Sequence, residues 1–404
     1  DLNNETADIK LESYLMNISN AYVSENAIYL LNQKYKYNYD EQIPISALFG
    51  LKGVFGIPDY YENLDSTNGY YTEIYKFDID KDGIVKYNAK TKVKGKTINQ
   101  YSLDEKDNHL RIALYDNDGS RVAIFDEDLK QIGISDNVAK GEKMYSSRFI
   151  GDKVYFVTYK TIDPLFVMDL SNETKPKVLG KLKIPGYSTY LHPYDENHII
   201  GIGMETKEII NRNSNGKVIS TTAKVVGMKM ALFDVSNVNS PVQISSVVIG
   251  DSRTTSAILT NPKALLFSKE KSLIAIPVNN YSQDFEVTSS NNYETMINNY
   301  TKYSKPYNAE GYFVYNINVQ DGFKLKGVIT HEKTNATYYY SSSKLLRGLY
   351  IDNNLYTVSE TMIKVNELDS LKAVGELKLK NIENVDSSVR EQSNNVINAI
   401  EGGM

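Results

Sequence analysis

Three aspartates at alternating positions, Asp78, Asp80 and Asp82, are followed directly by Gly83. This spacing is typical of the start of a calcium-binding loop, in which alternating oxygen ligands meet one ion and glycine allows a sharp turn. An EF-hand loop needs a glutamate at its end, however, and this chain has Ala89 there. A hairpin turn around Gly83 fits the same residues. We predict the turn, with a calcium site at the three aspartates as the alternative and no other cofactor.

Two of the four histidines, His192 and His198, lie close in sequence to Asp195 and Glu196. Such a group could hold a metal ion or supply an acid–base pair. The same stretch spans an expected hairpin, where Asp195 and Asn197 are typical turn residues. We favour the structural role.

A third candidate consists of Asp104, Glu105, Arg148 and Asp163, which fall at equivalent edges of a repeated unit and could line a central channel. Channels of this kind serve hydrolases and lyases, but ion pairs between repeats explain the same residues and are favoured here. The chain has no G-x-S-x-G motif, phosphate-binding loop or zinc motif. Four scattered histidines also argue against a serine nucleophile with a positioned base. No catalytic residue is assigned.

These side chains are positioned by a unit that recurs six times. Each unit has a turn residue followed by an apolar strand, and the turn residues are Asn26, Asn108, Asp152, Asn197, Lys271 and Asn353. A further strand, usually ending on Asp or Asn, covers residues 74–78, 122–126, 165–169, 230–234, 313–316 and 362–366. Four strands per unit, repeated, are typical of a β-propeller. We predict an all-β, six-bladed β-propeller, and a seventh blade within residues 279–311 stays open.

The units differ most between their second and third strands. Residues 33–72, 204–228 and 279–311 are longer there than a hairpin requires, and residues 331–343 form a long connection between units five and six. In a four-stranded meander these segments all emerge at one end of the blade, which we call the elaborated end. Tight turns such as 151–153 and 352–354 lie at the other, plain end. The sequence predicts long loop insertions on one face only.

Tyrosine is the unusual residue type, with 32 Tyr against 12 Phe and no Trp. A tyrosine offers an apolar ring with a polar tip, which suits contact surfaces, although it also favours strands. Loops are normally poor in aromatic residues, so their concentration in the long segments predicts a binding face rather than a cap that only covers the ring. The tyrosines of these segments are Tyr35, Tyr37, Tyr39, Tyr60, Tyr61, Tyr70, Tyr71, Tyr281, Tyr293, Tyr300, Tyr303, Tyr307, Tyr338, Tyr339 and Tyr340.

Composition excludes several classes of protein. The chain has 45 basic and 50 acidic residues, a net charge of −5, which argues against a nucleic-acid partner. Without cysteine it has no disulfide, zinc–thiolate site or cysteine nucleophile. No apolar run is long enough for a transmembrane span. The chain begins at Asp1, consistent with removal of a targeting segment.

Three phrases carry a family resemblance: GEKMYSSRFIGD at 141–152, TIDPLFVMDL at 161–170 and LKIPGYSTYLHPYDENH at 182–198. They resemble secreted proteins with a C-terminal β-propeller domain distantly related to WD40 repeats, and the resemblance extends over about residues 17–380. It implies an exported or cell-surface protein of a bacterium or archaeon and transfers no catalytic residues. The long Asn- and Tyr-rich insertions and the last twenty residues depart from the family.

The predicted organisation is an N-terminal segment 1–16 that adds a ring-closing strand, a propeller at 17–383 and a helical tail at 384–404. Val389, Val396, Ile397 and Ile400 give the tail a narrow apolar stripe. The predicted function is that of an extracellular or cell-surface, non-enzymatic scaffold that binds a protein or glycan of the cell envelope through the tyrosine-rich face. Assembly into a homo-oligomer or filament would use the terminal segments. The alternative is an extracellular hydrolase or lyase that acts on a glycan or peptide at the channel.

Overall fold

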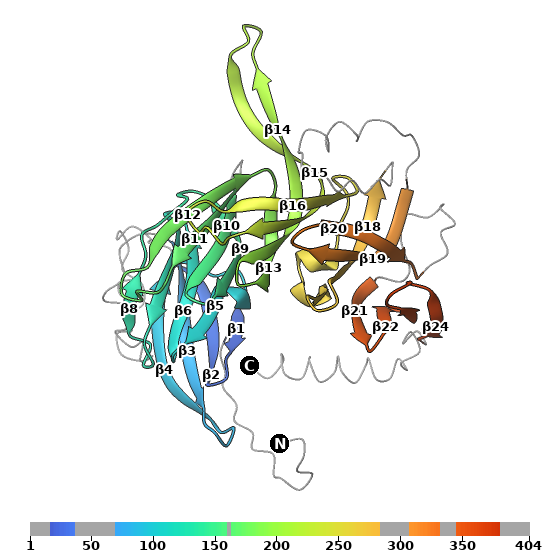
Figure 1. Ribbon diagram of the computed structural model, residues 1–404. Helices are drawn as coiled ribbons and strands as arrows, with labels where there is room; N and C mark the ends of the chain where they lie inside the picture. Colours follow the sequence, from blue (N-terminus) through green and yellow to red (C-terminus); the bar gives the residue numbers. More distant parts are fainter. Residues whose placement is uncertain (1–16, 37–68, 160–162, 283–306, 332–344, 380–404) are drawn as a thin grey trace, which may run out of the picture. The chain divides into compact units, whose positions relative to one another are not determined.

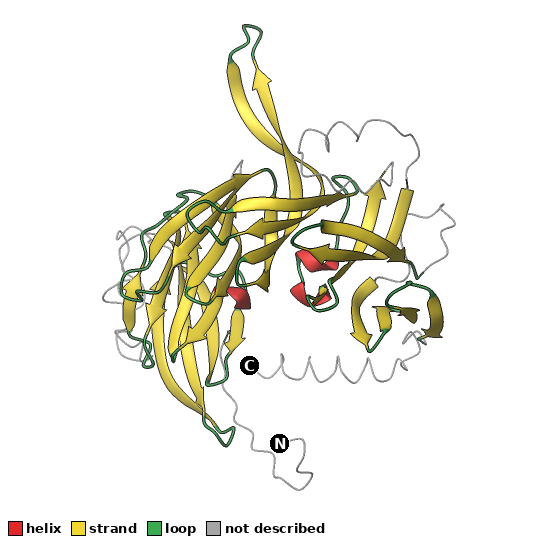
Figure 2. Ribbon diagram, in the orientation of Figure 1, coloured by secondary structure: helices red, strands yellow, loops and turns green. Residues whose placement is uncertain are grey.

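The computed structural model describes residues 17–36, 69–159, 163–282, 307–331 and 345–379. Within these ranges the chain consists of β-strands joined by turns (Figure 2). Three short 3-10 helices interrupt them: η1 (Gln100–Ser102), η2 (Ala257–Leu259) and η3 (Pro262–Ala264). The predicted N-terminal strand and C-terminal helical tail lie outside the described residues.

The first of two compact units comprises residues 1–160 and 164–181 and contains three four-stranded sheets, numbered blades 1 to 3 (Figure 1). Blade 1 consists of β1 (Asn20–Val23), β2 (Ala27–Lys36), β3 (Gly69–Ile79) and β4 (Val85–Lys94). Blade 2 consists of β5 (Leu103–Lys106), β6 (His109–Asp116), β7 (Gly119–Phe125) and β8 (Gln131–Ile134). Blade 3 consists of β9 (Lys143–Ile150), β10 (Lys153–Tyr159), β11 (Asp163–Asp169) and β12 (Lys177–Ile184), the last reaching the unit boundary.

The second unit, residues 161–163 and 182–404, contains blades 4 to 6. Blade 4 consists of β13 (Tyr187–Asp195), β14 (His198–Arg212), β15 (Val218–Asp234) and β16 (Val242–Ile249). Blade 5 consists of β17 (Leu266–Ser268), β18 (Leu273–Ser282), β19 (Tyr307–Asn318) and β20 (Gly322–Ile329). Blade 6 consists of β21 (Leu345–Ile351), β22 (Asn354–Ser359), β23 (Met362–Glu367) and β24 (Ala373–Lys378). All six predicted second and third strands are confirmed, and the described residues form six blades.

Apolar side chains fill the space between neighbouring blades of each unit. Because an inner strand has a sheet against both of its faces, β7 is buried along its whole length instead of alternating. Three clusters illustrate the packing of blade 1 on 2, 2 on 3 and 5 on 6. Their members include Leu31 and Leu110 in the first, Val122 and Phe156 in the second, and Leu355 and Tyr312 in the third. The core is therefore repeated between blades rather than gathered at one centre.

The Asp or Asn that ends most third strands has a local structural role. The side chain of Asp126 accepts hydrogen bonds from the backbone N–H groups of Asp128 (3.1 Å) and Lys130 (2.8 Å). Asp169 and Asp234 accept the equivalent bond two residues further on. These Asx turns reverse the chain into the fourth strand, which explains the recurrence of the acidic residue in the sequence.

The insertion at residues 204–228 is not a loop, so the prediction of loop insertions was wrong there. It continues β14 and β15 as a two-stranded ribbon whose pairing runs from His198–Asp234 to Arg212–Val218. Residues 207–222, which we call the arm, extend beyond the rest of the sheet with exposed side chains (Figure 1). In blade 5, β18 and β19 likewise continue into the insertion as far as the Ser282–Tyr307 pair. Residues 283–306, 37–68 and 332–344 lie outside the described ranges.

Candidate functional site

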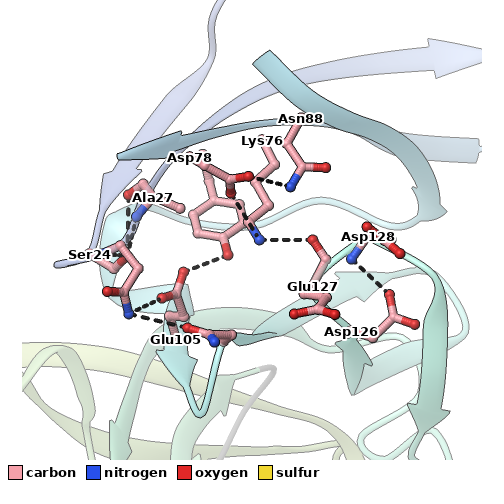
Figure 3. Close-up of polar contacts among 12 residues, drawn as sticks. Ser24, Ala27, Lys76, Asp78, Asn88, Glu105, Asp126, Glu127 and Asp128 are labelled. Atoms are coloured by element: carbon pink, nitrogen blue, oxygen red, sulfur yellow. Dashed lines mark hydrogen bonds and ion pairs between the residues drawn. The ribbon is translucent and has the colours of Figure 1, made fainter. Parts of the chain in front are cut away.

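The aspartates with calcium-loop spacing lie at the plain end of blade 1. Asp80 Oδ1 accepts two backbone N–H groups of its own turn, at 2.8 and 3.0 Å, and Gly83 has a φ of 74°. Asp78 accepts a hydrogen bond from Asn88 Nδ2 at 2.5 Å and lies 3.2 Å from Lys76 Nζ (Figure 3). Across the described ranges no group of three His, Cys, Asp or Glu side chains is placed to hold a metal ion. The hairpin is observed, and calcium stays a prediction.

The histidine–acid group forms a turn that links blade 4 to blade 5. Asp195 Oδ1 lies 2.7 Å from His198 Nδ1 and accepts the N–H of Asn197 at 2.9 Å, while Oδ2 accepts from Lys269 Nζ at 3.0 Å. Burial opposes ionisation of this carboxyl, but the three donors outweigh it and lower the pKa of Asp195 to about 2. His192 Nδ1 instead lies 3.0 Å from a tyrosine hydroxyl. The predicted turn bonding by Asp195 is observed, and its structural role stays the favoured interpretation.

Asp104, one of the predicted channel acids, is committed to an ion pair. Its carboxylate accepts from both Nε, at 2.9 Å, and Nη2 of Arg111. Arg111 Nη1 also donates to the carbonyl of Gly151 in blade 3 at 2.9 Å. The guanidinium of Arg148 lies over the ring of Tyr101, 4.9 Å from its centroid. The predicted ion pair between repeats was therefore wrong for Asp104: its ion pair lies within blade 2, and its partner is Arg111 rather than Arg148.

Glu105 connects blades 1 and 2. Its Oε2 accepts the hydroxyl of Tyr29 at 2.5 Å and its Oε1 accepts Asn26 Nδ2 at 3.2 Å; Figure 3 shows Glu105 between the two blades. The polar pairs that connect blade 2 to blade 3 in the same manner are Lys106 with Asp152 and His109 with Glu173. The plain end is thus a set of connections between blades. The side chain of Asp163 lies outside the described ones.

Of the predicted binding-face tyrosines, the structure describes the side chains of Tyr35, Tyr70 and Tyr71, at the elaborated end of blade 1. Tyr35 and Tyr70 are 39% and 38% exposed. Tyr71 is buried, and Lys92 Nζ lies 3.9 Å from its ring centroid. The side chains outside the described ones are those of Tyr37, Tyr39, Tyr60, Tyr61, Tyr281, Tyr293, Tyr300, Tyr303, Tyr307, Tyr338, Tyr339 and Tyr340.

Tyr35 and Tyr70 begin a row of aromatic and basic side chains. They are directly paired across β2 and β3, and their rings meet edge to face with centroids 4.9 Å apart. Lys96 Nζ lies 3.9 Å from the Tyr70 centroid and 5.2 Å from that of Tyr115. Two backbone hydrogen bonds, at 2.9 and 3.0 Å, pair Lys96 with Tyr115. The chain leaving blade 1 therefore holds this lysine between tyrosines of blades 1 and 2.

The row continues onto blade 3. Burial raises the pKa of Tyr115, and the nearby phenols of Tyr70 and Tyr145 raise it further. Tyr145 lies in a β-bulge between β9 and β10, and its ring meets that of Tyr159 edge to face at 5.7 Å. Lys143 Nζ lies 5.2 Å from the Tyr145 centroid. We call these five tyrosines (35, 70, 115, 145 and 159), with Lys96 and Lys143, the Tyr–Lys strip.

Sequence reasoning missed Tyr115, Tyr145, Tyr159 and both lysines of the strip, because it considered only long insertions. A signal was present: Tyr115 and Tyr159 lie at or next to the ends of second strands, and Tyr145 lies near the start of a first strand. A meander brings these positions to the elaborated end.

Lysines crowd the same end of blade 1. Glu73 accepts Lys34 Nζ at 2.9 Å, and Lys90 Nζ lies 3.7 Å from it; although burial opposes ionisation, these contacts lower the pKa of Glu73. Burial lowers the pKa of Lys92, whereas the negative charge of Glu73 raises it. The positive charges of Lys36, Lys34 and Lys90 add to the lowering. Several lysines thus gather around one carboxylate at this end of blade 1, on a protein whose net charge is −5.

Two buried ion pairs, also unanticipated, brace the elaborated end. In blade 2, Arg121 Nη2 lies 2.8 Å from Asp116 Oδ2 and donates to the carbonyl of Lys94. In blade 4, Lys229 Nζ lies 2.8 Å from Glu205 Oε2 and donates to the carbonyl of Pro185 at 3.0 Å. In each blade, a cation on the third strand pairs with an acid on the second strand. The same cation also donates to a backbone carbonyl in the segment that precedes the blade.

Comparison with known proteins finds relatives in two archaea. An uncharacterized protein of Archaeoglobus fulgidus is 30% identical over 79% of this chain and 43% of its own length. An uncharacterized protein of Methanocaldococcus jannaschii is 34% identical over 54% of this chain and 32% of its own length. The chain thus spans less than half of either relative.

Among solved structures, Sqt1 from Chaetomium thermophilum has 10% identity and a TM-score of 0.40 over 76% of this chain and 69% of its own. The C-terminal WD40 domain of Sif2 has 8% identity and a TM-score of 0.30 over 77% and 81%. The family model described as the beta propeller domain matches residues 1–371. With six four-stranded sheets in place, the chain belongs to the beta propeller domain family.

Proposed function

We propose that the protein is an exported, non-enzymatic scaffold that binds a protein or glycan of the cell envelope at the elaborated end of its blades. The observation that carries this proposal is the Tyr–Lys strip, which crosses three blades of one compact unit. The plain end of those blades is occupied instead by connections such as Glu105 with Tyr29. The strip therefore supports a partner site at the elaborated end of these three blades.

The physical argument is preorganisation. The tyrosines of the strip lie in or beside β-strands whose register is fixed, so little conformational entropy is lost when a partner contacts them.

Export is supported by the resemblance to secreted propeller proteins. In the described part of the chain no helix is long and apolar enough to cross a membrane.

The proposal is tested by co-sedimentation of the purified chain with cell-envelope material from the source organism. We expect the chain to sediment with the envelope, and the double variant Tyr35→Ser/Tyr70→Ser to lose most of this binding. The matched control is Tyr87→Ser, because Tyr87 is also exposed and also meets an aromatic ring (Phe77, 5.6 Å), but near the plain end of blade 1. Equal sedimentation of all three proteins would contradict the proposal.

Enzymatic action at the channel stays a prediction. Two of its candidate residues, Asp104 and Glu105, are held in structural bonds, which favours the scaffold. Self-assembly through the terminal segments, which lie outside the described residues, also stays a prediction.

A further inference from the structure

The Tyr–Lys strip contains the same arrangement twice. In blade 1, Tyr35 and Tyr70 form an edge-to-face pair, and Lys96 lies over the Tyr70 ring. In blade 3, Tyr145 and Tyr159 form an edge-to-face pair, and Lys143 lies over the Tyr145 ring. Tyr115 of blade 2 stands between the two and shares Lys96 with the first. A surface with a repeated pattern fits a ligand with a repeated structure.

The two lysines of the strip have no carboxylate partner among the described residues. Nearby acids are engaged elsewhere: Asp118 with Lys94 at 2.9 Å, Asp116 with Arg121 at 2.8 Å, and Glu142 as acceptor of a threonine hydroxyl. The contacts of Lys96 and Lys143 are instead with ring faces, which attract a cation without neutralising it. An anionic group on a ligand would supply the missing counter-charge.

The tyrosines supply the second recognition element. Tyr35 and Tyr70 are more than one-third exposed, and Tyr145 and Tyr159 are half-buried, so part of each side chain is accessible on a fixed support. Such side chains combine apolar contact with hydrogen bonding. A sugar ring, with its apolar C–H groups and its hydroxyls, is complementary to both.

We propose that the Tyr–Lys strip binds a linear acidic polysaccharide, with sugar rings on the tyrosine pairs and carboxylates on Lys96 and Lys143. This inference rests on the proposed function and specifies its ligand. A nucleic acid fits less well, because phosphate backbones are bound through many closely spaced cations. The strip itself carries only two lysines, Lys96 and Lys143, over three blades, and the net charge of the protein is −5.

The test measures binding of the full chain to polygalacturonate and to the same polymer fully methyl-esterified, which keeps the sugar backbone and removes the charge. We expect binding to polygalacturonate that weakens as NaCl rises from about 50 mM to about 500 mM, and little binding to the ester. The double variant Lys96→Gln/Lys143→Gln should bind polygalacturonate about tenfold more weakly. The control is Lys271→Gln, since Lys271 Nζ also lies 5.2 Å from a tyrosine centroid, but next to a plain-end turn of blade 5.

Each outcome separates this inference from the proposed function. Equal binding of both polymers, unaffected by Lys96→Gln/Lys143→Gln, would overturn the acidic ligand and leave a glycan-binding scaffold. No binding of either polymer, with envelope sedimentation retained, would also overturn it while the scaffold proposal stands. Tighter binding of an oligothymidylate, lost in the lysine variant, would replace the polysaccharide by a nucleic acid. If envelope sedimentation fails as well, both proposals fail.

Discussion

Lys229 and Glu205 form an ion pair of 2.8 Å between Nζ and Oε2 at the base of the arm, with both side chains almost fully buried. Burial raises the pKa of Glu205, and the charge of Lys229 partly opposes this rise. Backbone groups complete the pair: Lys229 donates to Pro185 O, and Glu205 Oε1 accepts the N–H of Thr206 at 3.0 Å. The pair therefore joins β14, β15 and the segment that enters blade 4.

Replacing one member of this pair should be costly. Lys229→Met leaves a buried carboxylate without its cation, and we expect the free energy of unfolding to fall by about 3–5 kcal/mol in urea titrations. The double variant Lys229→Met/Glu205→Met, which removes both charges, should be more stable than the single one. A single variant within about 1 kcal/mol of the parent would show that the pair is dispensable.

Gly348 of β21 is required by the close approach of Tyr312. A Cβ at this position would lie 2.6 Å from the buried tyrosine ring, so the ring or the strand must move. Gly348→Ala should lower the free energy of unfolding by about 1–3 kcal/mol, measured by chemical denaturation. Gly375→Ala in the same blade is the control, because a Cβ there meets nothing within 4 Å. Equal stability of the two variants would contradict the packing of blade 6 on blade 5.

His331 should make the second unit sensitive to acid. Burial is the main reason why the pKa of His331 is lowered from 6.5 to about 4. The positive charge of Lys364 also lowers this pKa, and the negative charge of Glu376 opposes the shift. Its ring nitrogens lie 2.9 Å from Ser359 Oγ and 2.8 Å from Thr357 Oγ1.

Because the folded pKa lies below the unfolded one, the unfolded state binds the proton first as the pH falls. The contribution of neutral His331 to the free energy of unfolding is complete above about pH 6.5 and is lost as the pH falls toward 4. The total loss is on the order of 3 kcal/mol. Urea unfolding of the parent and of His331→Gln at a series of pH values measures this. The variant should lose less stability than the parent on acidification, and parallel curves would show that His331 is not the sensitive group.

The arm should be dispensable for folding. Residues 207–222 are almost all exposed, including Ile210 and Ile219, so they add little to the core. Replacing residues 207–224 by Asn-Gly would close the Thr206–Val225 pair with a two-residue turn. We expect the melting temperature of the shortened chain to stay within about 2 °C of the parent. Unfolding or aggregation of the shortened chain would mean that the arm is covered and structurally required.

The repeat predicted the fold because a series of similar blades leaves a period in the sequence, and the Asx-turn residues such as Asp126 and Asp234 mark it. The sequence did not predict the regular ribbon at 204–228, since its aliphatic residues come in adjacent pairs such as Ile209–Ile210 and Val218–Ile219 and do not alternate onto one face. Nor could spacing reveal that Tyr115 shares Lys96 with Tyr70, because that contact joins two blades. Partners such as Arg111 for Asp104 depend on register, which composition does not fix.

The most direct test of the binding surface is hydrogen–deuterium exchange of the full chain with and without saturating polygalacturonate, read peptide by peptide. The account predicts slower exchange in peptides that contain Tyr35, Tyr70, Lys96 and Tyr145, and unchanged exchange at the plain-end turns 151–153 and 352–354. Protection at the plain turns with none at the Tyr–Lys strip would contradict it.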